Sequence, residues 1–332
     1  MSIVFLIIGL IILAGLIWLA TQPAAYEVTR SRVIQVSPSE VYSKVADLRH
    51  WGSWSPWLMH ESDSAMEYGD TTNVPQGWFS WSSNHIGSGK VTHVSMVENE
   101  SIEQALEFHK PVKSKTDVSW RFSPVGDATE VTWSMRGKMP FLFRWMSRMM
   151  DGWVGKDYEI GLAKLAMVSG DDSDPFEISF PGVMEGKPVN YLFSHFAGSV
   201  EDMKTVMSET YPKLMQAVVD SNLEINGVPF TLYHEFNQKK NQVICDMAIP
   251  VAEVKEVDGF SVGFLPEETY QRTALSGDYK HLKMAWYSAF SHARMFKYKI
   301  KTGKPMIERY VTDIREHQGL AIKTTIDIPL KS

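Results

Sequence analysis

Cysteine is almost absent from this chain, because Cys245 is the only one in 332 residues. An internal disulfide needs two cysteines and a multi-cysteine metal site needs more, so both are excluded. Cys245 stands in an apolar strand pattern, which predicts a buried, unreactive thiol. The sequence also lacks a His-Glu-x-x-His motif, a nucleophile elbow and a complete phosphate loop. We therefore expect no recognisable catalytic residue, no metal and no cofactor.

Excess basic charge is absent as well. The chain has 33 Lys and Arg against 39 Asp and Glu, a formal net charge of -6, and no basic run. Domains that bind nucleic acid usually carry a positive face, and no helix-turn-helix pattern is present, so we expect no nucleic-acid partner. An apolar content of 44% with 22% charged residues indicates a folded protein, and the length suits two domains.

Charged side chains are missing from residues 1–26, and residues 3–20 are almost wholly apolar. Such a run spans roughly 27 Å as a helix, which is near the lower limit for crossing a bilayer. A cleavable signal peptide is the competing interpretation, but no Lys or Arg precedes the apolar run. We expect residues 1–25 to be an uncleaved single-pass anchor in the cell membrane. Arg30 and Arg32 follow it, which favours a cytoplasmic location for the remaining chain.

Residues 28–168 have the pattern of one α+β domain. Residues 28–36 alternate as a strand does, and Ser37-Pro38-Ser39-Glu40 has the form of a capping box that starts a helix. We expect this helix to end at Trp51-Gly52. Four alternating segments separated by turn signals follow between Gly87 and Met139. Residues 142–165 then predict a long helix with one broad apolar face.

This order of elements is that of a helix-grip fold, and several motifs support it. They are Ser37–Tyr42, Asp47–Trp51, Trp54–Trp57, Gly87–Gly89 and Val131–Met135. In these residues the chain resembles the SRPBCC superfamily, the START-like proteins of the polyketide cyclase type. The resemblance implies a curved sheet that holds a long helix and leaves a cavity for lipids or other hydrophobic molecules. It identifies a fold more than an activity.

Aromatic and polar residues of this domain are candidates for lining such a cavity. The aromatic candidates are Trp78, Trp81, Trp120 and Trp133. Ordinary packing in the core of the sheet is the favoured interpretation for these four. The polar candidates are His85, Glu107 and His109. Glu107 and His109 share one face of a strand, and that face is either the cavity or the solvent side.

Residues 169–175, rich in Asp, Gly and Ser, predict a linker, and the sequence after it is written twice. The pairs that lie 79 positions apart are Tyr191 and Tyr270, Gly198 and Gly277, Lys204 and Lys283, and Ile249-Pro250 and Ile328-Pro329. Each copy has the pattern of a strand, an amphipathic helix and two further strands. A duplicated unit of this kind usually forms a cleft between its halves.

Residues 176–332 carry a second resemblance. The matching segments are Gly227–Tyr233, Ala248–Val251, Pro305–Tyr310 and Ile326–Leu330. In these the chain is similar to the GyrI-like domain, the effector-binding module of AraC-type activators. Members of that family bind amphipathic, often cationic, molecules between the two halves. The resemblance implies Glu308, Tyr310, Tyr233 and Trp286 as ligand contacts.

The chemistry of these residues is consistent with that expectation. A buried carboxylate is costly to desolvate, so a cationic ligand would compensate it, and aromatic faces would add cation–π attraction. The alternatives are that Glu308 pairs with Arg309 or Lys304 on the surface and that Trp286 is a core residue.

We expect a membrane-anchored protein that senses or sequesters a hydrophobic or amphipathic small molecule. One alternative is a hydrolase or cyclase, with Glu308 as general base and Tyr310 or Tyr233 as proton partner. Another is an adaptor at the membrane, for a protein partner that the sequence does not identify.

Overall fold

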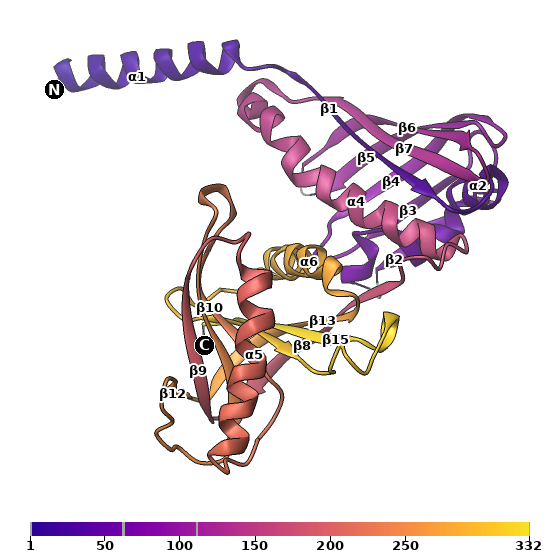
Figure 1. Cartoon of the computed structure of the whole chain (residues 1–332). Coiled ribbons are helices and arrows are strands. Elements are labelled where there is room, and N and C mark those ends of the chain that lie inside the picture. The colour runs from indigo at the N-terminus through magenta and orange to yellow at the C-terminus, as the bar shows by residue number, and fades with distance from the viewer. Residues whose placement is uncertain (1, 62–63, 111, 332) are drawn as a thin grey trace. The chain divides into compact units, whose positions relative to one another are not determined.

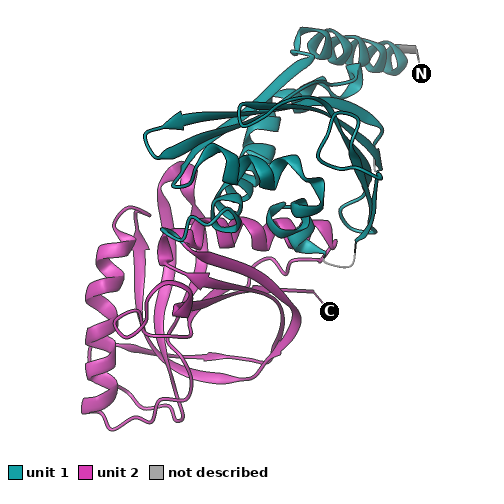
Figure 2. Ribbon diagram, turned by 90° about the vertical axis from the view of Figure 1, so that its right-hand side faces the viewer, with its two compact units in different colours: residues 1–174 teal, residues 175–332 magenta. Residues whose placement is uncertain are grey.

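Two antiparallel sheets, each packed against helices, make up most of the chain (Figure 1). The computed structural model describes residues 2–61, 64–110 and 112–331. The chain divides into two compact units, residues 1–174 and 175–332 (Figure 2). This mixed α+β architecture, with an apolar helix at the N-terminus, confirms the expected fold class.

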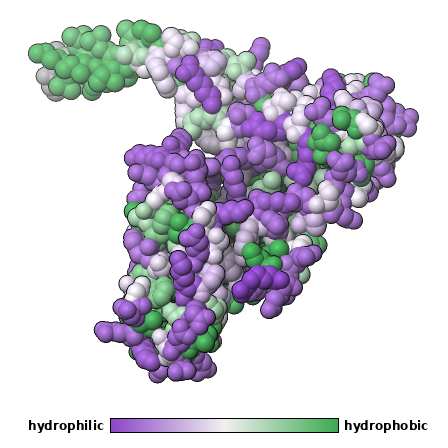
Figure 3. Space-filling view, viewed as in Figure 1, coloured by the Kyte–Doolittle hydropathy of each residue, from purple (hydrophilic) through white to green (hydrophobic). Residues whose placement is uncertain are grey.

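The N-terminal helix α1 (Ser2–Thr21) follows from the run of apolar residues. Its stretch Ile3–Thr21 has a mean hydropathy of 3.0. By length and composition, this stretch is long and apolar enough to cross a membrane. None of its side chains is buried, and in the space-filling view it forms a continuous hydrophobic surface (Figure 3).

The sheet of unit 1 has seven strands among the described residues, in the order β1-β7-β6-β5-β4-β3-β2. They are β1 (Ala25–Ile34), β2 (Ala65–Tyr68), β3 (Trp78–Ser82), β4 (Ser88–Val97), β5 (Ser101–Lys110), β6 (Ser114–Val125) and β7 (Ala128–Lys138). All neighbours pair antiparallel. The sequence pattern predicts five of these strands and misses β2 and β3, which are short and have no strict alternation.

Helix α2 (Pro38–Ala46) begins at the predicted capping box. The Glu40 carboxylate accepts hydrogen bonds from the backbone N–H and the hydroxyl of Ser37, at 2.8 and 2.7 Å. The predicted end at Trp51-Gly52 is wrong, because α2 ends at Ala46. The Asp47 carboxylate accepts the N–H of Arg49 at 3.0 Å, a local bond that competes with the helical one. Short helical turns follow: η1 (Leu48–His50), α3 (Trp51–Trp54) and η2 (Leu58–His60).

The predicted helix over residues 142–165 is two elements, η3 (Phe141–Met149) and α4 (Met150–Val168). Leu162 and Leu165 on α4 are buried in the core as expected. The expectation of one apolar core face is wrong for η3, where Leu142 and Trp145 are exposed. The reason is that η3 is a 3₁₀-helix, whose three residues per turn place different side chains inward from an α-helix.

Aromatic rings fill the interior of unit 1 between sheet and helix. The rings of Tyr158 and Trp133 stack at 3.7 Å, and those of Trp133 and Trp120 stack at 4.4 Å. Trp54 packs edge-on against both tryptophans. Trp120 and Trp133 are therefore core residues, as the favoured interpretation has it, while Trp78 and Trp81 are half-buried.

The sheet of unit 2 has eight strands among the described residues, in the order β12-β9-β11-β10-β14-β15-β13-β8. The strands are β8 (Phe176–Gly186), β9 (Val189–Gly198), β10 (Phe230–Asn237), β11 (Gln242–Val251), β12 (Ser261–Leu265), β13 (Glu268–Gly277), β14 (Met306–Tyr310) and β15 (Lys323–Pro329). Helix α5 (Met203–Asp220) contacts β9 and β11, and α6 (Leu282–Met295) contacts β13 and β15. The remaining turns are η4 (Gln238–Lys240), η5 (Tyr279–His281) and η6 (Gly319–Ala321).

This strand order reflects the duplication. If each strand of the first copy (β8 to β11) is exchanged with its counterpart in the second (β12 to β15), the strand order becomes that of the same sheet read from its other edge. Each copy has one more strand at its start than the sequence pattern predicts. That strand pairs with the other copy, because β8 pairs with β13 and β12 pairs with β9. The two copies therefore pair with each other at both edges of the sheet, and β10 pairs with β14 at its centre.

Candidate functional site

A buried carboxylate lies at the centre of unit 2. Glu308 on β14 is only 2% exposed. The indole N–H of Trp286 on α6 donates to its Oε2 at 2.6 Å, and the Tyr310 hydroxyl donates to its Oε1 at 2.8 Å. Tyr233 on β10 also helps to lower the pKa of this carboxylate. Burial raises the pKa of Glu308, and the interactions with Trp286, Tyr310 and Tyr233 offset only part of that effect.

A chain of hydroxyl groups continues from this carboxylate to the first copy of the repeat. The oxygens of Tyr310 and Thr231 lie 2.8 Å apart, and those of Thr231 and Tyr211 lie 2.9 Å apart. Because Tyr310 donates to an ionised Glu308, its oxygen accepts from Thr231, which in turn accepts from Tyr211. The hydrogen bonds of α5 and β10 are thus directed toward a carboxylate supplied by the second copy.

Aromatic rings surround these polar groups. The rings of Tyr233 and Trp286 meet edge to face at 5.6 Å, as do those of Tyr211 and Tyr310. Tyr279 lies 5.7 Å from the Tyr310 ring. Burial raises the pKa of Tyr279 to about 12 and raises that of Tyr211, Tyr233 and Tyr310 as well, so all four are neutral hydrogen-bonding groups near neutral pH.

The structure brings together the four residues singled out from the sequence, Glu308, Tyr310, Tyr233 and Trp286. The alternative of a surface ion pair for Glu308 is wrong, because Arg309 points to the other face of β14 and pairs with Asp327 at 2.9 Å. Trp286 is half-buried, and its hydrogen bond to Glu308 gives it a polar role beyond core packing. A role of the four in binding a ligand stays a prediction.

Tyr211 and Tyr279 are not singled out by the sequence, and Thr231 is identified there only as one of the two residues, with Glu235, nearest to the position of Glu308 in the first copy. A signal existed for Tyr211, because it lies 79 positions before Phe290, so both copies carry an aromatic residue at this helix position. Thr231 required the strand register. It pairs directly across from Glu308, and Tyr233 and Tyr310 have the same 77-residue separation as Thr231 and Glu308. The pseudo-twofold axis of the repeat therefore passes between Thr231 and Glu308, and only one side of it carries a charge.

The polar candidates of unit 1 and Cys245 do not join the site around Glu308. Glu107 on β5 is half-buried and pairs with Lys115 at 3.0 Å, and His85 and His109 are exposed, so these residues lie on the solvent side and do not line a cavity. Cys245 is buried, as predicted, and burial raises the pKa of its thiol to about 12. Within the part of the chain that the structure describes, no cluster of three His, Cys, Asp or Glu is arranged to hold a metal.

A second polar cluster lies on the sheet of unit 2. Asp246 on β11 is almost fully buried and accepts from His195 Nδ1 at 2.7 Å and His234 Nε2 at 2.6 Å. Burial would raise the pKa of Asp246, but the hydrogen bonds from the two histidines outweigh it and lower that pKa. The same contact raises the pKa of His234. Asp246 is thus compensated by histidines, whereas the partners of Glu308 are all neutral.

One protein family matches part of this chain. Residues 25–170 match the polyketide cyclase / dehydrase and lipid transport family. This match covers unit 1 except for α1. Comparison with curated proteins found no match.

Solved structures similar to parts of the chain are distant in sequence. The C-terminal domain of EcmrR is 17% identical, over 47% of this chain and 98% of that chain, with a TM-score of 0.40. SAV2435, solved with tetraphenylphosphonium, is 11% identical over 46% of this chain and 94% of that chain, with a TM-score of 0.37. Protein CV1439 from Chromobacterium violaceum is 13% identical over 44% of this chain and 98% of that chain, with a TM-score of 0.32.

Proposed function

We propose that this chain is a membrane-anchored protein that binds hydrophobic or amphipathic small molecules, with an aromatic cation as the ligand of unit 2. The observation that carries this proposal is the buried Glu308, whose hydrogen-bond donors Trp286 and Tyr310 are both neutral. Neutral donors stabilise a carboxylate but leave its charge uncompensated, and a cation supplies what is missing. Tyr233, Tyr279 and Trp286 provide the faces that attract such a cation.

Two further observations support the remaining parts of the proposal. The family that matches residues 25–170 includes lipid transport, which supports a hydrophobic ligand for unit 1. The apolar helix α1 supports a membrane anchor, and Arg30 and Arg32 after it support a cytoplasmic location for both units.

The ligand of unit 2 can be tested with tetraphenylphosphonium, a large aromatic cation. We expect saturable binding to the full chain in nanodiscs, measured by calorimetry. Glu308→Gln should weaken it at least about tenfold, equivalent to about 1.4 kcal/mol. Affinity should also rise with pH, because a protonated Glu308 carries no charge to attract the ligand.

Two controls separate this site from general hydrophobic binding. Glu209→Gln changes an exposed acid on the same unit and should leave the affinity unchanged. Tetraphenylborate has the same shape with the opposite charge and should not compete. If Glu308→Gln binds the cation as the unaltered chain does, or if tetraphenylborate binds equally well, unit 2 does not recognise a cation.

The raised pKa of Glu308 also favours a second candidate function, a hydrolase or cyclase in which this residue is the general base. Tyr310, at 2.8 Å, would be its proton partner. Catalysis predicts that Glu308→Gln abolishes turnover of a reactive substrate while its binding survives. Loss of binding in the same variant supports the first proposal, a protein that binds the molecule without converting it.

A further inference from the structure

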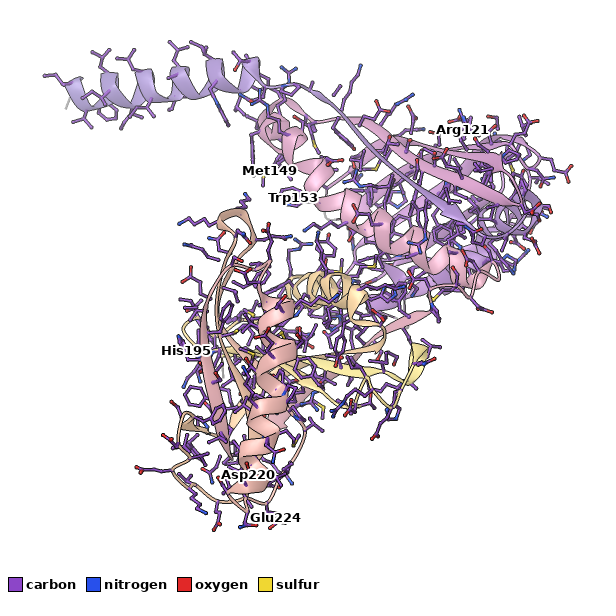
Figure 4. All side chains as sticks on the ribbon, in the orientation of Figure 1. Arg121, Met149, Trp153, His195, Asp220 and Glu224 are labelled. Carbon is purple, nitrogen blue, oxygen red and sulfur yellow. The ribbon has the colours of Figure 1, made fainter. Side chains whose placement is uncertain are left out.

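The segment η3 exposes an unusual amount of apolar surface. Five of its nine residues are large apolar side chains that are between 39% and 63% exposed: Phe141, Leu142, Phe143, Trp145 and Met149. Figure 4 labels Met149 at the end of this segment, where α4 begins. A contiguous apolar patch of this kind on a soluble surface usually marks an interaction site.

Hydrogen bonds hold η3 beside the C-terminal end of α1. Ser147 is buried, and its hydroxyl donates to the carbonyl of Pro23 at 2.7 Å. The backbone N–H of Met139, just before η3, donates to the carbonyl of Ala24 at 2.8 Å. A 3₁₀-helix aligns every third residue, so Leu142, Trp145 and Arg148 form one row on the exposed side. The apolar side of η3 is therefore fixed at the point where the apolar helix ends.

An apolar groove of about 360 Å³ lies between the two segments. Its walls include Ile12, Leu16 and Leu19 of α1 and Leu142 and Trp145 of η3. Because α1 contributes one wall along its second half, anything that surrounds α1 also reaches this groove. A bilayer is the environment that would surround a helix as apolar as α1.

The charges of η3 match the polar boundary of a bilayer. The Arg144 guanidinium lies 5.2 Å from the Phe141 ring, and its Nε is buried without a hydrogen-bond partner. Arg148 is exposed on the row of Leu142 and Trp145. A lipid phosphate would accept hydrogen bonds from the guanidinium of Arg144, because guanidinium groups bind phosphate strongly. Tryptophan and arginine beside apolar side chains are also the composition of segments that lie in the membrane interface.

We propose that η3 lies in the interface of the bilayer that α1 spans. Its apolar side chains and the groove are filled by acyl chains, and Arg144 and Arg148 contact anionic headgroups of the same leaflet. This inference rests on the proposed anchor. It goes beyond it, because it orients unit 1 with the start of α4 at the lipid surface, where a hydrophobic ligand enters or leaves the membrane.

The test places single spin labels on the full chain in a Cys245→Ser background, in nanodiscs of phosphatidylcholine with phosphatidylglycerol. Leu142→Cys reports on η3, Leu10→Cys on the middle of α1, and Val125→Cys on the exposed tip between β6 and β7. Power saturation then compares collision with oxygen, which enters lipid, and with a water-soluble nickel chelate. We expect oxygen to dominate at Leu142, more strongly at Leu10, and the nickel chelate to dominate at Val125.

Each outcome has one meaning. A label at Leu142 that behaves as Val125 does, while the label at Leu10 reports lipid, overturns the inference and leaves the anchor intact. A label at Leu10 that reports water overturns the anchor and, with it, the inference. Arg144→Gln with Arg148→Gln should move the Leu142 label toward water in anionic nanodiscs and have a smaller effect in pure phosphatidylcholine. An equal effect in both overturns the assignment of the arginines to headgroups.

Discussion

The two copies within unit 2 share a backbone plan but differ in how their helices pack on the sheet. Under α5 the sheet presents Leu192 and Cys245, both fully buried. The residues 79 positions later, under α6, are Gln271 and Thr324, which are equally buried but polar. The Gln271 Oε1 and Thr324 Oγ1 atoms have no hydrogen-bond partner. The first copy therefore has an apolar helix–sheet contact, and the second has one with unsatisfied polar groups.

This difference assigns different tasks to the two halves. The helix side chains follow the same division, because Leu214 on α5 corresponds to the small Ala293 on α6. Unsatisfied buried polar atoms cost about 1–3 kcal/mol each, so α6 is held less firmly than α5. The same helix carries Trp286, which covers Glu308. If unit 2 binds a ligand at this carboxylate as proposed, we expect the less stable helix to be displaced while the first copy stays as a rigid support.

The largest expected effect comes from breaking the apolar contact of the first copy. Leu214→Ala leaves a cavity under α5 and should lower the free energy of unfolding of unit 2 by about 2–5 kcal/mol. Urea unfolding followed by hydrogen exchange of β11 peptides measures it. Val219→Ala changes an exposed residue of the same helix and should cost little. A cost for Leu214→Ala as small as that of Val219→Ala would contradict a tight first copy.

The next largest effect is on the pH dependence of stability, which should differ between the buried acids of the two copies. The pKa of Glu308 is raised by burial, so the folded chain keeps this proton to higher pH than the unfolded chain does. Its contribution to stability is present below the ordinary glutamate pKa and is lost as pH rises through the raised value, by about 1.4 kcal/mol per pH unit. Glu308→Gln should therefore be more stable than the unaltered chain at neutral pH and equal to it near pH 4.

Asp246 supplies the matched control. Its pKa is lowered, so its contribution to stability changes with pH in the opposite direction to that of Glu308. Its contribution is present above the ordinary aspartate pKa and is lost as pH falls through the lowered value. Asp246→Asn should therefore be less stable than the unaltered chain at neutral pH, with the difference shrinking in acid. Thermal melts across pH 3 to 8 separate the two variants. Equal pH profiles for both would show that Glu308 is not destabilised by burial.

The sequence predicts the repeated elements of unit 2 because apolar periodicity and paired anchor residues lie within short segments. It also predicts the group around Glu308, since a family pattern already places those residues together. The exchanged strands β8 and β12 could not be predicted, because strand pairing across the copies depends on tertiary contacts and not on local pattern. The exposed side of η3 could not be predicted for the same reason: its apolar residues fit an α-helical face, and the 3₁₀-helix that holds Ser147 against Pro23 depends on tertiary contacts.

The smallest expected effect comes from making the second copy resemble the first. Gln271→Leu removes a buried carbonyl oxygen without a partner, but it also removes the hydrogen bond from the amide to Thr273 at 2.8 Å. The gain exceeds the loss, so we expect unit 2 to become more stable by about 1 kcal/mol. The double variant Gln271→Leu with Thr273→Val removes both partners and should gain at least as much. Because a firmer α6 resists displacement from Glu308, both variants should bind tetraphenylphosphonium more weakly. A variant that loses stability would show that the buried amide is satisfied in solution, which contradicts its weakening of the helix–sheet contact in the second copy.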